Sequence, residues 1–158
     1  MSDRSLLLLL DEVRGKTIRL LQGVTQEESL WTPPGISNHV LWHTGHAYVL
    51  SEWMTVKASG RQPQMPHHWF DMFSWKSEPA MVPESRWPPI AAVLQTLSKQ
   101  HMRLHHAISE LTEEQLAAPA QTSPNHTVRY SILHGLHDEA CHGGEIWLLR
   151  KMWRKRRG

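Results

Sequence analysis

Apolar residues recur every three or four positions along most of the chain, which predicts amphipathic helices. The first predicted helix covers residues 5–22 and ends at Gly23. Its core-facing stripe consists of Leu6, Leu9, Leu10, Val13, Thr17, Leu20 and Leu21. A Pro-Pro-Gly turn follows, and Ser37 or Asn38 is expected to cap a second helix that runs to residues 59–60.

Two further helices are predicted in the second half of the chain. One covers residues 89–111, and Thr112 with Gln115 then forms a capping box for a short helical turn. Residues 119–125 read as a loop, and the last helix opens near Thr127. The predicted buried arc of that helix consists of Ile132, Leu133, Leu136, Ala140, Ile146 and Trp147.

Residues 61–89 separate the second and third predicted helices and show no stable period. This stretch is rich in proline and aromatic residues, and its length is typical of a crossover between parallel helices. Its aromatic side chains either cover a pocket or seal the end of the bundle; they are Trp69, Phe70, Phe73 and Trp75. The pattern therefore predicts one all-α domain over residues 1–158, a four-helix bundle with a long crossover loop between helices 2 and 3.

Composition narrows the classes of function. The chain has 158 residues, 40% of them apolar, which is enough for one domain with a real core. Its 17 basic and 15 acidic residues give a net charge of +2, too small to require a nucleic-acid or membrane partner. The single cysteine, Cys141, excludes an intrachain disulfide and suits a reducing compartment. The apolar run of residues 6–10 is too short for a signal peptide or a membrane span, so we expect a cytoplasmic protein.

The last helix carries an unusual density of possible metal ligands. The side chains of His134, Asp138, Cys141, His142 and Glu145 fall within roughly 100° of one another at the pitch of an α-helix. Asp138 and His142 are four residues apart, a spacing that lets one helix supply two ligands to a metal. His137 lies roughly 140° away from His142 and does not join this group.

The second helix supplies further imidazoles on its predicted inner face. That stripe consists of His39, Trp42, His43, His46, Val49, Leu50 and Trp53. Any one of these histidines alone is best interpreted as a hydrogen-bonded core residue. Together with Asp138 and His142 on another core-facing helix, they favour a metal site.

Two other features invite a functional reading. His101 and His105 of the third helix also have the spacing of metal ligands, but only Glu110 accompanies them on that face, so we expect surface or partly buried residues. Six of the last nine residues are basic, which suggests nucleic-acid binding. We favour the interpretation that this basic segment is simply the solvent-exposed C-terminus of a helix, because cations complement the helix dipole there and the sequence contains no DNA-binding motif.

Four stretches resemble the DinB/YfiT-like superfamily of four-helix proteins: NHVLWHTGHAYVLSEW, HHWFDMFSWKSEP, LTEEQL and HDEACHGGEIWLLRK. Together they span nearly the full length of the chain. The resemblance implies a divalent metal held by His46, Asp138 and His142. Many members have histidine where this chain has Asp138, so Glu139, or a shifted frame using His137, remains open as the third ligand.

Two imidazoles and one carboxylate leave coordination positions open, which is typical of a catalytic metal. Such a metal activates water for hydrolysis or holds a thiol as thiolate, and the resemblance implies thiol-dependent transferase or isomerase chemistry in some members. We expect a small-molecule substrate, a low-molecular-weight thiol cosubstrate in the transferase case, and zinc or nickel ahead of iron or manganese. His43 and His134 are the candidates for general bases or for partners that orient a ligand. The alternative is a non-catalytic metal-binding or dimerisation bundle, and in either case we expect a homodimer through exposed apolar helix faces.

Overall fold

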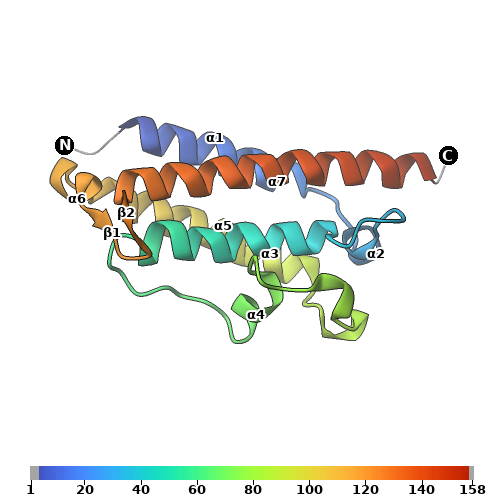
Figure 1. The fold of residues 1–158 in the computed structure, drawn as a ribbon. Coiled ribbons are helices and arrows are strands. Elements are labelled where there is room, and N and C mark those ends of the chain that lie inside the picture. The colour runs from blue at the N-terminus through green and yellow to red at the C-terminus, as the bar shows by residue number, and fades with distance from the viewer. Residues whose placement is uncertain (1–3, 157–158) are drawn as a thin grey trace.

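Four long helices form the body of the molecule in a computed structural model that describes residues 4–156. They are α1 (Arg4–Leu20), α3 (Val40–Ser51), α5 (Ile90–Ser109) and α7 (Val128–Arg156). A π-helical segment, η1 (Glu52–Lys57), continues α3. α1 and α7 run in one direction, and α3 and α5 run in the other (Figure 1). The predicted helical bundle is confirmed, with α3 and α5 as the parallel neighbours that need a crossover.

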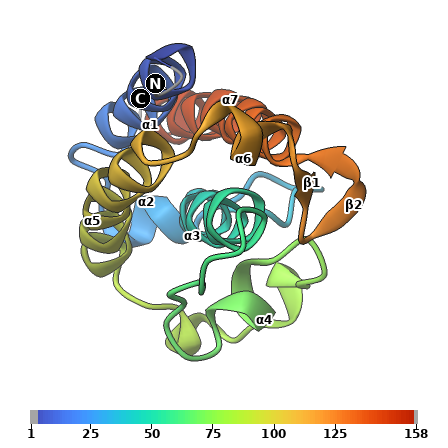
Figure 2. The same ribbon diagram turned by 90° about the vertical axis from the view of Figure 1, so that its left-hand side faces the viewer.

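Helix α3, the second of the four predicted helices, lies in the middle of the molecule when the bundle is viewed from its end (Figure 2). α1, α5 and α7 cover one side of it, and the crossover segment covers the other. Every residue of α3 is buried, in agreement with the many large apolar side chains around the whole helix. The helix that carries His43 and His46, and that His39 precedes as its cap, is therefore completely buried.

The crossover is a long, mostly irregular segment, as predicted, but it packs closely on α3. It contains α4 (Trp69–Phe73) and two 3₁₀ turns, η2 (Pro79–Met81) and η3 (Glu84–Arg86). Trp69 and Phe73 are buried in the main apolar cluster. Gly45 makes this approach possible, because a Cβ atom at that position would lie 2.3 Å from the Phe73 ring. These two aromatic residues therefore seal the bundle, whereas Trp75 stays half exposed.

The predicted capping box of Thr112 and Gln115 is confirmed at the start of α6 (Glu113–Ala117). Other local elements differ from the prediction. A short helix, α2 (Gln26–Leu30), forms before the Pro-Pro-Gly turn. The predicted loop after α6 is instead a hairpin of β1 (Pro119–Ala120) and β2 (Ser123–Thr127). The expected cap of the second helix is wrong as well: His39 caps α3, with its Nδ1 accepting a hydrogen bond from the Trp42 amide at 3.0 Å.

A buried polar network crosses the bundle at Arg14, a residue that the apolar pattern passes over. The guanidinium is fully buried and binds both carboxylate oxygens of Glu139, at 2.8 and 2.9 Å. It also donates to Ser51 on α3 and to Gln100 on α5. One side chain of α1 therefore links all four long helices.

Two arginine side chains near the C-terminal end of α7 make contacts within the protein. Arg150 is buried and donates to Glu28 at 2.7 Å, and the Arg156 guanidinium lies over the Trp153 ring. Arg157 of the basic tail lies outside the described residues. Within residues 4–156, no helix combines the length and the apolar composition needed to cross a membrane.

Candidate metal centre

The structure brings together one histidine of α3 and two side chains of α7. Asp138 Oδ2 lies 3.4 Å from His46 Nε2 and 3.2 Å from His142 Nε2. The two residues of α7 face the same side because they are four positions apart, as the sequence predicted. Ligands on one tetrahedral zinc ion, with bonds of about 2.0–2.1 Å, lie about 3.3 Å apart. The three side chains therefore have the spacing of a metal-binding group, and their ligand atoms all lie within 4.8 Å of one another.

The orientation of His46 is set by the crossover segment. Its Nδ1 donates to the backbone carbonyl of Phe73 at 2.7 Å, so in the neutral imidazole the lone pair is on Nε2. The Trp42 ring stacks on the imidazole with centroids 4.7 Å apart and planes inclined by 16°. A hydrogen bond to a carbonyl on the far nitrogen is the usual support of a histidine metal ligand.

One carboxylate oxygen of Asp138 has no hydrogen-bond partner among the described residues. Oδ2 is buried and makes no hydrogen bond to any part of the described structure, although the two imidazole nitrogens lie beside it. Burial by itself raises the pKa of this carboxyl group, but His142 and His46 outweigh burial and hold the pKa well below its usual range. A carboxylate that stays ionised between two imidazoles suits a divalent cation.

A second cluster adjoins the first through His142. Its Nδ1 lies 2.8 Å from Nδ1 of His43, and Glu145 Oε2 lies 3.0 Å from His43 Nε2. The latter geometry is not that of a hydrogen bond, so His43 Nε2 has no hydrogen-bond partner within residues 4–156. Burial is the main reason that the pKa of His43 falls to about 3, with the neighbouring charges of His142, His46 and His39 adding to it. His43 is therefore neutral at physiological pH, and this His, His and Glu group could also hold a metal.

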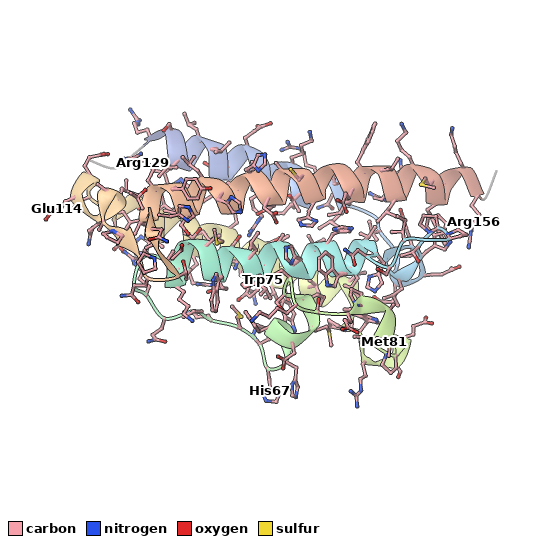
Figure 3. The ribbon with its side chains drawn as sticks, viewed as in Figure 1. His67, Trp75, Met81, Glu114, Arg129 and Arg156 are labelled. Carbon is pink, nitrogen blue, oxygen red and sulfur yellow. The ribbon has the colours of Figure 1, made fainter. Side chains whose placement is uncertain are left out.

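A hollow of about 240 Å³ opens beside the first cluster. Its lining includes His46 and Asp138, together with His134, which the sequence proposed as a general base. The rest of the lining is apolar and consists of Leu50, Trp53, Met54 and Trp75. Trp75 lies close to α3 in Figure 3, whereas His67 of the same crossover projects away from the bundle. A small molecule entering this hollow would meet the candidate metal position directly.

The alternatives for the third ligand are placed elsewhere. The Glu139 carboxylate, about 100° around α7 from Asp138, points to Arg14 and is almost completely buried there. His137 is exposed, and its Nε2 lies 3.9 Å from Sγ of Cys141, which is exposed as well. The structure thus brings Asp138 to His46 and His142. It leaves Glu139, His137 and Cys141 outside the cluster.

The sequence does not predict two contributors to this region. The helical pitch puts Glu145, which follows His142 by three residues, on the same arc and so beside it on the helix, but assigns it no contact with His43. The Phe73 carbonyl leaves no sequence signal, because any residue has a backbone oxygen. Only the packing of α4 against Gly45 brings that oxygen to His46.

Comparisons with known proteins agree with this architecture. The sequence profile of the DinB superfamily matches residues 9–146, which include all four long helices in whole or in large part. A comparison with curated proteins found no similar sequence.

Proposed function

The chain belongs to the DinB superfamily, and from the geometry of its site we propose that it is a metal-dependent enzyme acting on a small molecule. One divalent ion is held by His46, Asp138 and His142 at the core of the bundle. The substrate enters by the hollow that His134 and Trp75 line.

The observation that carries the proposal is the unpartnered oxygen of Asp138. The Phe73 carbonyl accepts a hydrogen bond from Nδ1 of His46, so in the neutral imidazole the lone pair of Nε2 faces the Asp138 carboxylate oxygen at 3.4 Å. Two electron-rich atoms at that distance repel each other, and burying the oxygen without a partner costs roughly 1–3 kcal/mol. A cation between them turns this unfavourable contact into coordination.

The donor set supports catalysis rather than a purely structural role. Three protein ligands leave positions open for water or substrate, and zinc or nickel suits two imidazoles and one carboxylate best, with iron or manganese as alternatives. When bound, the ion lowers the pKa of water or of a thiol to near neutrality. His134 lies in the wall of the same hollow and is the candidate general base for either a hydrolase or a thiol-dependent transferase or isomerase.

His43 acts as a positioning residue for His142. When His142 Nε2 binds a metal, its Nδ1 carries the proton and donates to His43 Nδ1 at 2.8 Å. We expect His43→Leu to weaken metal binding by about 10- to 100-fold. His43→Asn keeps an acceptor near the position of Nδ1 and should restore most of the affinity. Equal affinity in the leucine variant and the native protein would exclude this role.

The first test is metal content, measured by elemental analysis of untagged protein after incubation with zinc or nickel. The variants Asp138→Asn and His142→Gln should lose the ion bound at this site. His137→Gln is the matched control, since it changes an exposed histidine on the same helix. If the native protein and Asp138→Asn bind the same number of ions with the same affinity, the assignment of the ligands is wrong.

The second test separates the two reaction types in metal-loaded protein. Hydrolase activity on ester or amide probes needs no thiol, whereas transferase activity appears only when a low-molecular-weight thiol is added. His134→Gln should lower the turnover number of either reaction by about 10²–10⁴-fold with little change in metal content. A metal-loaded protein that turns over no probe favours the alternative of a non-catalytic metal-binding or dimerisation bundle.

Nucleic-acid binding through the C-terminal tail remains the least favoured function. Arg150 is bound to Glu28, and the Arg156 guanidinium lies over the Trp153 ring, so neither side chain is fully available to a phosphate. Binding by the tail would weaken steeply with salt and would disappear when Arg154 to Arg157 are replaced. Both effects are measurable with a labelled duplex.

A further inference from the structure

We propose that Asp11, His101 and His105 form a second divalent-metal site, on the surface between α1 and α5. His101 and His105 are four residues apart on α5, so their imidazoles lie one turn apart on one face. The sequence shows no carboxylate beside them other than Glu110. The fold supplies one from α1, ninety residues away in the chain.

Asp11 lies between the two imidazoles. Its Oδ1 is 2.8 Å from Nε2 of His101, and its Oδ2 is 3.6 Å from Nε2 of His105. Each separation by itself is close to the roughly 3.3 Å between two ligands of one tetrahedral zinc ion. The two imidazoles meet opposite oxygens of the carboxylate, however, and the three ligand atoms do not all lie within 4.8 Å of one another, as they do in the two clusters between α3 and α7. Binding one ion therefore requires at least one imidazole to rotate. Side-chain exposures of 24% for His101 and 45% for His105 leave room for it.

Metal binding here needs no proton to leave the protein. In the contacts as they stand, each neutral imidazole can donate Nε2–H to the carboxylate. When the ion binds Nε2, the proton of each ring is carried on Nδ1 instead, which is the other neutral tautomer. The donor set of two imidazoles and one carboxylate then suits zinc, nickel or cobalt.

The surroundings of these side chains leave space for an ion and its water ligands. A shallow hollow of about 290 Å³ is lined by Asp11, His101, Met102 and His105. Among these described lining residues, none carries a lysine or arginine charge that would repel a cation. The pair His106 and Glu110 offers a comparison, because it joins one imidazole to one carboxylate on the same helix without a second histidine.

The second site shares no residue with the candidate centre of α3 and α7, so it does not depend on the proposed function. It joins α1 to α5, whose contact is one of the most extensive between two helices of the bundle. An ion held only by the folded protein raises its melting temperature, and the rise grows with the logarithm of the free-ion concentration once that exceeds the Kd. The site would therefore link divalent-metal concentration to the stability of the bundle.

The test is calorimetric titration of metal-free, untagged protein with zinc. Native protein should take up two equivalents, and His101→Gln or Asp11→Asn should reduce this to one. His106→Gln, the matched control at an exposed neighbour, should still take up two. A variant with both Asp138→Asn and His142→Gln should retain one equivalent, and adding His101→Gln to it should remove that one.

Melting curves give a second readout in the same proteins. Zinc should raise the Tm of the Asp138→Asn/His142→Gln variant, and the rise should vanish when His101→Gln is added. The proposal is overturned if His101→Gln and Asp11→Asn leave both zinc stoichiometry and affinity unchanged. Loss of one equivalent in Asp138→Asn/His142→Gln, with retention of the other, would support both sites independently. Failure of the first site alone would leave one equivalent that still depends on His101.

Discussion

His39 shows how one buried imidazole couples the start of a helix to pH. Its Nδ1 accepts a hydrogen bond from the Trp42 amide, so this nitrogen has to stay unprotonated for the cap to form. Burial lowers the pKa of His39 to about 4, a shift that a backbone hydrogen bond partly offsets. The folded protein therefore binds the proton less readily than the unfolded chain, whose histidine titrates near 6.5.

This shift predicts that stability falls as pH decreases from about 6.5 to about 4. In that window the unfolded chain gains a proton that the folded protein lacks, and the loss at pH 5 is about 2 kcal/mol for His39. The variant His39→Asn keeps a capping oxygen without a titrating group. Urea denaturation at pH 7.5 and pH 5 should show a smaller pH dependence in His39→Asn than in native protein. An equal dependence in both proteins would refute the assignment.

Gly45 is the residue that allows the crossover segment to reach His46. In Gly45→Ala the new Cβ atom overlaps the Phe73 ring, so we expect the free energy of unfolding to fall by about 1–3 kcal/mol. Metal affinity should fall as well, because the Phe73 carbonyl orients His46. Gly144→Ala is the matched control: its Cβ atom would meet nothing within 4 Å, and alanine should stabilise α7 by about 0.5–1 kcal/mol. Equal stability of the two variants would contradict this account.

At the scale of the elements, the long helices are tied together by polar as well as apolar contacts. Arg14 and Glu139 make a bidentate pair, and both side chains are almost completely buried. Removing one partner leaves an uncompensated charge inside the bundle, whereas removing both leaves only a change in packing.

We therefore expect Arg14→Met to lower the free energy of unfolding by about 3–5 kcal/mol. The double variant Arg14→Met/Glu139→Leu should recover much of that loss. Arg61→Met removes a surface pair with Glu110 and should cost less than about 1 kcal/mol. Urea denaturation of the four proteins measures these differences. A single-variant loss no larger than that of Arg61→Met would show that the buried pair contributes little.

At the scale of the whole molecule, exposed apolar side chains lie on the neighbouring helices α1 and α7. Leu8 on α1 and Trp147 and Leu148 on α7 are each more than half exposed. Burying such residues in a second copy is favourable, so a homodimer remains our prediction.

Sedimentation velocity over a range of protein concentrations tests this prediction. Leu148→Glu should shift the protein toward the monomer if the interface includes α7. Met81→Glu is the control, since Met81 is exposed on the crossover, away from α7 (Figure 3). A native protein that sediments as a monomer at every concentration would rule the dimer out.

The periodicity of apolar residues predicted the buried face of α7 only in part. Ile132, Leu136 and Ile146 are buried as predicted, but Leu133, Ala140 and Trp147 are exposed. Glu139 and Arg150 occupy buried positions that an apolar pattern cannot identify, because each is buried only with a partner from another helix. Hydrophobicity therefore located the helix but misplaced the edges of its inner face.

The sequence by itself determined the four helices, the crossover and the pairing of Asp138 with His142, because helical periodicity and i, i+4 spacing are local properties of the chain. It also indicated the superfamily to which the chain belongs. Only the tertiary structure placed Asp138, rather than Glu139 or His137, beside His46. The same holds for the Phe73 carbonyl at His46 and for Asp11 at the histidines of α5. These contacts join residues far apart in the chain, and the rotation and packing of whole helices decide which of them meet.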